Sequence, residues 1–359
     1  MEKVPGLGLN EIFNLLKNII LIMKKKYKIL VTGCAGFLGS HLSEKLSNLG
    51  HEIVGIDNMK GGYKDNIPSN IKFYKIDCCD FDYVKKIMNG VEIVYHCAAT
   101  AHEGLSVFSP YEITKNNFLA SVSIFSAAVN QKVKRIIFCS SMARYGSQPA
   151  PFTEEMKVMP VDPYAISKVA AEEVLINLCD LNKIEWVIAV PHNIIGPRQR
   201  YDDPFRNVVS IMINRILQKK PPIIYGDGEQ KRCFSYIDDC LSCLIPMLDQ
   251  KNLNKQIINI GPDEEFVSIN KVAEICSNIT RTNLLPIYKP DRPREVKHAT
   301  CSADKARKLL NYKTSTSLQE GIQKTYEYIK NRGVRPFDYN IDIEIKNELT
   351  PTTWTKKEI

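Results

Sequence analysis

Tyr164 and Lys168 are the two residues whose types and spacing most directly indicate chemistry. They lie in the stretch VDPYAISKVAAEE, where Asp162 can cap a helix and Pro163 suits its first turn. A separation of four positions places both side chains on one face of that helix. A phenol with a pKa near ~10 is a poor base at neutral pH, but a neighbouring ammonium favours the phenolate. The pair therefore predicts a tyrosine base that is assisted by a lysine.

Three evenly spaced glycines stand between an apolar run and a helical pattern near residue 35. Gly33, Gly36 and Gly39 lie in ILVTGCAGFLGSHL. Glycine permits a tight turn, and a pyrophosphate can then approach the backbone N–H groups at the start of the helix. The next strand, EIVGID, ends in Asp57, which suits hydrogen bonds from both ribose hydroxyls of an adenosine and repels a 2′-phosphate. The pattern predicts that the chain binds NAD rather than NADP.

Other residues at the ends of predicted strands extend this cofactor site. Asp77 and Cys78 follow the third strand, where the adenine would lie, and Ala98 and Ala99 end the fourth, where small side chains leave room for the cofactor. The predicted cofactor-binding residues are Gly33, Gly36, Phe37, Leu38, Gly39, Asp57, Asn58, Asp77, Cys78, Ala98, Ala99, Tyr164 and Lys168.

The elements that must position these residues follow a strand–helix alternation from Lys26 onward. The early strands are continuous Val/Ile runs, which is typical of a sheet covered by helices on both faces. The alternation predicts an α/β fold, a doubly wound parallel (Rossmann) sheet with a smaller α/β substrate-binding cap domain. The expected division is an N-terminal extension (1–25), an NAD-binding domain (26–192, rejoined by 233–262), the cap (193–232 and 263–333) and a C-terminal arm or tail (334–359).

Charge and cysteine usage restrict the class of protein. The net charge of +8 is mild for 359 residues and comes from dispersed basic residues, so it favours an anionic small molecule over a nucleic acid. Eleven cysteines stand mostly in apolar stretches, which favours a reducing, cytoplasmic location over a disulfide framework. Cys240 and Cys243 form a lone C-x-x-C in DDCLSCLIPML and are predicted to pack in the core; no metal site is expected.

The first 25 residues leave several interpretations open. The stretch EIFNLLKNIILIM has helical spacing, yet it is too short to span a bilayer and lacks the features of a signal peptide. Met23 would make a natural start, and the alternatives are a helix that packs on the body of the protein or lies on a membrane surface. No integral membrane span is predicted.

Together, the G-x-x-G-x-x-G loop and the later Y-x-x-x-K resemble the extended short-chain dehydrogenase/reductase superfamily, from about Lys26 to about Gly333. Within it, the chain is most similar to the NAD-dependent epimerase/dehydratase family, and there to the UDP-glucose 4-epimerases. The resemblance implies that Ser141, which ends the strand KRIIFCSS, hydrogen-bonds the reacting hydroxyl for Tyr164. It also implies that Asn116 lies near the cofactor.

In this family the two residues after the catalytic serine indicate the reaction. By resemblance, 4,6-dehydratases carry Asp and Glu there, decarboxylases that form UDP-xylose carry a Glu, and fucose-synthase-type enzymes use a Cys. Met142 and Ala143 have no ionisable group, which favours reversible oxidation and return of hydride by a 4-epimerase. The alternatives are a UDP-uronic acid 4-epimerase, a net reductase and, from another class, a non-catalytic NAD-binding protein.

The resemblance also implies a substrate site for a UDP-sugar or another nucleotide sugar. Paired arginines suit a diphosphate, since each guanidinium can bind two oxygens. Thr300 falls near the position that sets sugar size, where a small residue admits an N-acetylhexosamine as well as glucose or galactose. A homodimer is implied, built from the helix over residues 112–129 and the helix of Tyr164. The implied substrate-binding residues are Ser106, Asn193, Asn207, Tyr225, Arg232 and Arg292.

Overall fold

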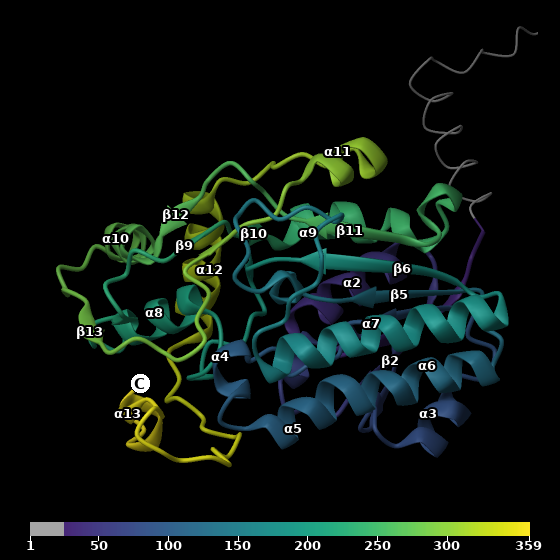
Figure 1. Cartoon of the computed structure of the whole chain (residues 1–359), viewed down its shortest axis with the longest axis horizontal. Helices are drawn as coiled ribbons and strands as arrows, with labels where there is room; N and C mark the ends of the chain where they lie inside the picture. The colour runs from purple at the N-terminus through teal and green to yellow at the C-terminus, as the bar shows by residue number, and fades with distance from the viewer. Residues whose placement is uncertain (1–24) are drawn as a thin grey trace, which may run out of the picture.

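A seven-stranded sheet forms the centre of the computed structural model, which describes residues 25–359 (Figure 1). The strand order is β11-β6-β5-β4-β1-β2-β3, and every neighbouring pair is parallel. This confirms the predicted doubly wound α/β fold; the predictions for residues 1–24 lie outside the described residues. The strands are β1 (Lys28–Thr32), β2 (Glu52–Asp57), β3 (Lys72–Lys75), β4 (Ile93–His96), β5 (Arg135–Cys139), β6 (Glu185–Pro191) and β11 (Gln256–Ile260).

Helices cover both faces of the sheet because successive strand residues point to opposite sides. Ile29 and Val31 enter one core and Leu30 enters the other. The first face is covered by α2 (Phe37–Asn48), α9 (Ile237–Leu244) and α11 (Asp304–Leu310), and the second by α3 (Phe81–Ile87), α6 (Ala120–Asn130) and α7 (Pro163–Asn182).

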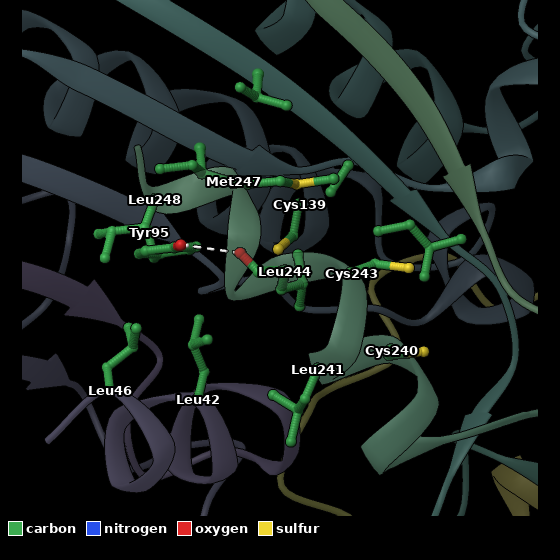
Figure 2. Close-up of a cluster of buried hydrophobic side chains, with 14 of the residues drawn as sticks. Leu42, Leu46, Tyr95, Cys139, Cys240, Leu241, Cys243, Leu244, Met247 and Leu248 are labelled. Carbon is green, nitrogen blue, oxygen red and sulfur yellow. Dashed lines mark hydrogen bonds between the residues drawn. The ribbon is translucent and has the colours of Figure 1, made fainter. Parts of the chain in front are cut away.

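The C-x-x-C motif lies in the first of these cores, as predicted. Figure 2 shows Cys240 and Cys243 on α9, which packs beside α2 and its Leu42 on the same face of the sheet. Both thiols are fully buried among apolar side chains, and burial raises their pKa values. The buried Tyr95 hydroxyl donates to the Leu244 carbonyl oxygen at 2.9 Å and so ties α9 to β4.

A smaller layer of helices and short strands lies over the carboxyl edge of the sheet (Figure 1). Three helices with a shared apolar core dominate it: α8 (Val208–Leu217), α10 (Ile269–Thr280) and α12 (Leu318–Arg332). Its strands pair as β7 (Ile194–Ile195) with β10 (Ser235–Tyr236), as β8 (Ile223–Tyr225) with β13 (Ile287–Lys289), and as β9 (Lys231–Arg232) with β12 (Val267–Ser268) and β14 (His298–Ala299).

Short elements complete the described chain. These are η1 (Lys64–Asn66), α4 (Glu103–Ser106), α5 (Pro110–Thr114), the π-helical turn η2 (Lys115–Leu119), η3 (Met142–Tyr145), η4 (Pro246–Leu248), η5 (Lys251–Leu253) and α13 (Thr352–Thr355). Over residues 25–359, we find no helix with the length and hydropathy needed to cross a bilayer.

A buried ion pair fixes the loop after β5 to α7. Arg144 of η3 is 5% exposed and contacts the Glu172 carboxylate at 3.0 Å, and Glu172 also accepts a hydrogen bond from the Ser140 hydroxyl. The Arg144 carbonyl oxygen accepts from the Met159 amide at 2.8 Å. Because Glu172 is one helical turn beyond Lys168, these contacts set the position of Ser141 relative to the face of α7 that bears Tyr164 and Lys168.

We predict that the Glu172→Leu variant is strongly destabilised, because it leaves the Arg144 guanidinium buried without its counter-charge. The free energy of unfolding should fall by about 3–5 kcal/mol, as measured by denaturant titration. The double variant Arg144→Met/Glu172→Leu should recover most of the loss, since an apolar pair of similar volume removes the buried charge. A single variant as stable as the wild type would contradict this account.

Candidate active site

The predicted cofactor residues gather around one cavity at the carboxyl edge of the sheet. This follows from parallel pairing, which brings the ends of β1, β2 and β4 to the same edge. The π-helical turn η2 adds Asn116 to the wall. The predicted residues that line this cavity are Gly33, Gly36, Phe37, Leu38, Gly39, Asp57, Asn58, Asp77, Cys78, Ala98, Ala99 and Asn116.

The glycine loop has the geometry that a dinucleotide requires. Gly33 has φ of +71°, and a Cβ atom on Gly39 would lie 2.2 Å from the Gly33 carbonyl oxygen. Helix α2 begins at Phe37 without a side-chain cap, so its first N–H groups face the cavity that Phe37 and Leu38 line. An uncapped helix start beside glycines fits the pyrophosphate of NAD.

Asp57 lies at the end of β2 and is 7% exposed. Its carboxylate accepts hydrogen bonds from the Ala35 amide at 3.0 Å and the Met59 amide at 2.7 Å, and burial raises its pKa. Each carboxylate oxygen can accept a second bond, so both remain able to receive a ribose hydroxyl. Asn58 donates to Asp77 at 3.0 Å and joins β2 to the end of β3.

Ser141, Tyr164 and Lys168 line a second cavity, which adjoins the first because Phe37, Leu38 and Ala99 line both. Helix α7 begins as predicted, with Pro163 in its first turn and the Asp162 side chain accepting from the Ala165 amide at 2.9 Å. Tyr164 is 6% exposed and Lys168 is 2% exposed. The predicted catalytic residues therefore lie in the second cavity, and Tyr164 and Lys168, which are also predicted to bind the cofactor, do not line the first.

Burial perturbs the two ionisable groups in opposite directions. It raises the pKa of Tyr164 to about 12, although the Ser141 hydroxyl acts to lower it, and it lowers the pKa of Lys168 to about 8. The Lys168 ammonium donates to the Cys139 carbonyl oxygen at 2.9 Å. In the protein without its cofactor, desolvation outweighs the neighbours that favour the phenolate. The lowered phenol pKa that we predict depends also on the positive nicotinamide ring and stays a prediction.

The substrate residues implied by resemblance mostly line the second cavity. Asn193, Asn207, Tyr225, Arg232 and Arg292 do so.

Ser106 and Thr300 lie elsewhere. Ser106 is fully buried, and its hydroxyl donates to the Glu103 carbonyl oxygen at 2.7 Å and to Asp162 at 3.2 Å, so it supports the cap of α7. Thr300 is 5% exposed, and its carbonyl oxygen accepts from the Phe152 amide at 2.8 Å. The resemblance implies that both lie near the sugar, but neither lines the two cavities.

The two asparagines hold the backbone around the second cavity. Both have left-handed backbone angles, with φ of 41° at Asn193 and 51° at Asn207, which asparagine tolerates. Asn193 donates to the Cys233 carbonyl oxygen at 2.9 Å. Asn207 caps α8 by accepting from the Val209 amide at 3.1 Å.

The two arginines form a cationic end of the second cavity. Arg292 donates to Glu295 at 2.8 and 3.1 Å, and its guanidinium lies 4.9 Å from the centre of the Tyr225 ring. Arg232 donates to the carbonyl oxygens of Lys231, Lys297 and Val296 and lies 4.0 Å from Glu295. Burial lowers the pKa of Arg232. The carbonyl contacts hold Arg232 in one orientation toward the cavity.

Several ionisable residues that line the two cavities were missed in the sequence, among them Glu103 and Arg206. Glu103 lines the second cavity, and its side chain is accessible from that cavity. Desolvation by the surrounding protein, and then the negative charge of Asp162, raise the pKa of Glu103 to about 7. The positive charges of Arg232 and Arg292 act to lower it. Arg206 lines both cavities and acts to lower the pKa of Tyr164. Neither lies in a recognised motif, although Glu103 follows closely on the end of β4.

The comparisons with known proteins agree with this site. The NAD dependent epimerase/dehydratase family matches residues 29–261. The chain is 31% identical to the UDP-glucuronate 4-epimerase of Thermodesulfobacterium geofontis, over 84% of this chain and 95% of that protein. It is 29% identical to the UDP-N-acetyl-alpha-D-glucosaminuronate decarboxylase of Bacillus cytotoxicus, over 85% and 98%.

A similar crystal structure is that of the UDP-glucose 4-epimerase of Thermotoga maritima with UDP-glucose. The TM-score is 0.80 at 30% identity, covering 85% of this chain and 99% of that one. With a cavity that fits NAD and a match over 29–261, the chain belongs to the NAD-dependent epimerase/dehydratase family, and the predicted NAD cofactor is confirmed.

Proposed function

We propose that this chain is an NAD-dependent nucleoside-diphosphate-hexose 4-epimerase that acts on a UDP-sugar. The observation that carries the proposal is the content of the loop after β5. Ser141 lines the cavity beside Tyr164, whereas Met142 and Ala143 carry no acid or thiol and Arg144 is turned into the core toward Glu172. Such a loop supports oxidation and reduction at a carbinol and no elimination step.

The site residues then have distinct roles. Bound NAD+ supplies the acceptor and donor of the C4 hydride and a positive ring that lowers the pKa of the neighbouring phenol. Tyr164 removes the proton from O4 of one epimer and returns it to O4 of the other, while Ser141 orients that hydroxyl. Lys168 adds positive charge on the same helix face. Arg232 and Arg292 hold the diphosphate while the 4-keto sugar turns about its link to the phosphate.

The relatives, together with the cavity residues, restrict the set of candidate sugars. UDP-glucose/UDP-galactose and the N-acetylhexosamine pair fit the proposal, and the 4-epimerases among the relatives include one for UDP-glucuronate. A UDP-uronic acid 4-epimerase is therefore the second candidate. A reducing, cytoplasmic location is supported by the eleven cysteines, none of which forms a disulfide within residues 25–359.

A homodimer is supported by apolar side chains left on the outer face of η2 and α7. Leu119 and Ile166 are each 52% exposed, on elements that pack against one another. Tyr111 of the adjoining α5 is 72% exposed. Two copies of this face would bury these side chains in a four-helix contact.

The Tyr164→Phe variant should lose turnover by about 10²–10⁴-fold without unfolding, because the ring still packs while the proton acceptor is gone. The measurement is NMR of the products formed from UDP-galactose or UDP-N-acetylgalactosamine, without added cofactor. Tyr83→Phe, at a tyrosine that is 53% exposed on α3, is the matched control. A near-wild-type rate in Tyr164→Phe would overturn the assignment.

The Glu103→Gln variant tests the carboxyl near the arginines. Because its pKa is raised to about 7, Glu103 is neutral below that pH and repels an anionic diphosphate above it. We expect the wild-type KM for the nucleotide sugar to rise as pH increases through 7, and the variant to show a flatter profile. Glu155→Gln, on the surface, should behave as wild type. A kcat reduced about 100-fold in Glu103→Gln would instead assign Glu103 to proton transfer and contradict a simple epimerase.

Replacing Leu119 and Ile166 by Arg should convert the proposed dimer to a monomer, since burying two guanidinium groups in an apolar contact is unfavourable. Light scattering after size-exclusion chromatography measures the mass. Leu285→Arg, at a residue 82% exposed in the cap, is the control. A monomeric wild-type protein would contradict the homodimer.

A further inference from the structure

Residues 337–359, which we call the strap, contribute to the walls of both cavities. Asn340 and Ile341 line the cavity assigned to the cofactor, and Ile359 lines the cavity assigned to the substrate. In Figure 1 the strap is the yellow segment that passes near α5 and ends at α13 beside the cap. One segment, remote in sequence from the catalytic loop, therefore touches both ligand sites.

The strap is attached first to the sheet-bearing half of the molecule. The Ser109 hydroxyl donates to the Asp342 carbonyl oxygen at 2.8 Å, and the Ile345 amide donates to the Phe108 carbonyl oxygen at 2.8 Å. Glu344 accepts from the first two amides after Pro110, both at 2.9 Å. These contacts hold the strap along the segment that joins α4 to α5.

The strap is also attached to the cap. Asp338 pairs with Arg200 at 2.6 Å, and its amide donates to the Asp202 carbonyl oxygen at 2.7 Å. Arg215 of α8 donates to the Glu358 carbonyl oxygen at 3.1 Å. The strap thus links the sheet-bearing half of the protein to the cap.

Helix α13 of the strap contacts the cationic end of the substrate cavity. The Thr353 and Tyr225 hydroxyls are hydrogen-bonded at 2.7 Å, and Arg292 lies over the same tyrosine ring. Trp354 is 2% exposed, with its ring centre 6.0 Å from that of Phe108, 5.3 Å from that of Phe205 and 6.3 Å from that of Tyr225.

Gly104 leaves room for the packing of Trp354 and Arg292. A Cβ atom on Gly104 would lie 3.3 Å from the Arg292 guanidinium and 3.7 Å from the Trp354 ring. Gly104 and Arg292 line the same cavity, and the Trp354 ring packs close to Gly104. The orientation of Arg292 and Tyr225 is therefore determined partly by residues of the strap.

We propose that Thr353 and Trp354 are positioning residues that hold Tyr225 and Arg292 in place to bind the nucleoside diphosphate of the substrate. The inference rests on the proposed function for the nature of the ligand. It adds to that function a segment outside the catalytic motifs that sets affinity for the nucleotide and leaves the chemistry at Tyr164 unchanged.

The test is a binding titration that needs no turnover. The chain has two tryptophans, so Trp186→Phe leaves Trp354 as the sole indole emitter beside the site. UDP, dTDP, ADP and GDP are each titrated into this protein with its NAD retained. Thr353→Val, which removes only the hydroxyl, is then added to the same background. Thr355→Val, at an exposed threonine on the same helix, is the matched control.

We expect at least one nucleoside diphosphate to change the Trp354 emission and to bind about 3- to 10-fold more weakly to the Thr353→Val protein, the effect of one lost hydrogen bond. KM for the nucleotide sugar should rise by a similar factor while kcat stays within about twofold. Equal affinity in the Thr353→Val protein and the control would overturn the strap's role and leave the proposed function standing. No binding of any of the four nucleotides by the parent protein would overturn both.

Discussion

Parallel pairing of the central strands is the constraint on which the site depends. In a parallel sheet all carboxyl ends lie at one edge, so the glycine loop after β1, Asp57 at the end of β2 and Ala98 after β4 meet around one cavity. The same rule brings Ser141, which follows β5, to the adjoining cavity. Alternating Ile29, Leu30 and Val31 supply the two apolar cores that keep this edge rigid.

The electrostatics of the site show what the fold does to its reactive groups. Burial raises the pKa of Tyr164 and lowers that of Lys168, so desolvation opposes the charged form of both. The protein holds the lysine ammonium by the Cys139 carbonyl and anchors the serine loop through the buried Arg144–Glu172 pair. The cationic ring of the bound cofactor would add the further positive charge that favours the phenolate form of Tyr164.

The residues proposed to bind the substrate lie on segments that are far apart in the chain. Arg232 lies on β9, Tyr225 on β8 and Arg292 in the loop before β14, and the strap contacts this group from residues 353 and 354. Such a site can change its preference for a nucleotide or a sugar without altering the Tyr164–Lys168 helix, because the two sets belong to different elements.

The sequence by itself determined the fold class, and its motifs predicted residues that the structure gathers around the two cavities. Each of these rests on a local pattern in which a strand, a turn and a helix follow directly in the chain, as with Gly33, Gly36 and Gly39. Only the tertiary structure decided the rest. It placed Ser106 behind the cap of α7, brought Glu103 beside the arginines and joined Thr353 to Tyr225. These contacts link residues that are far apart in sequence, so no local pattern encodes them; they arise when the cap and the strap fold over the sheet edge.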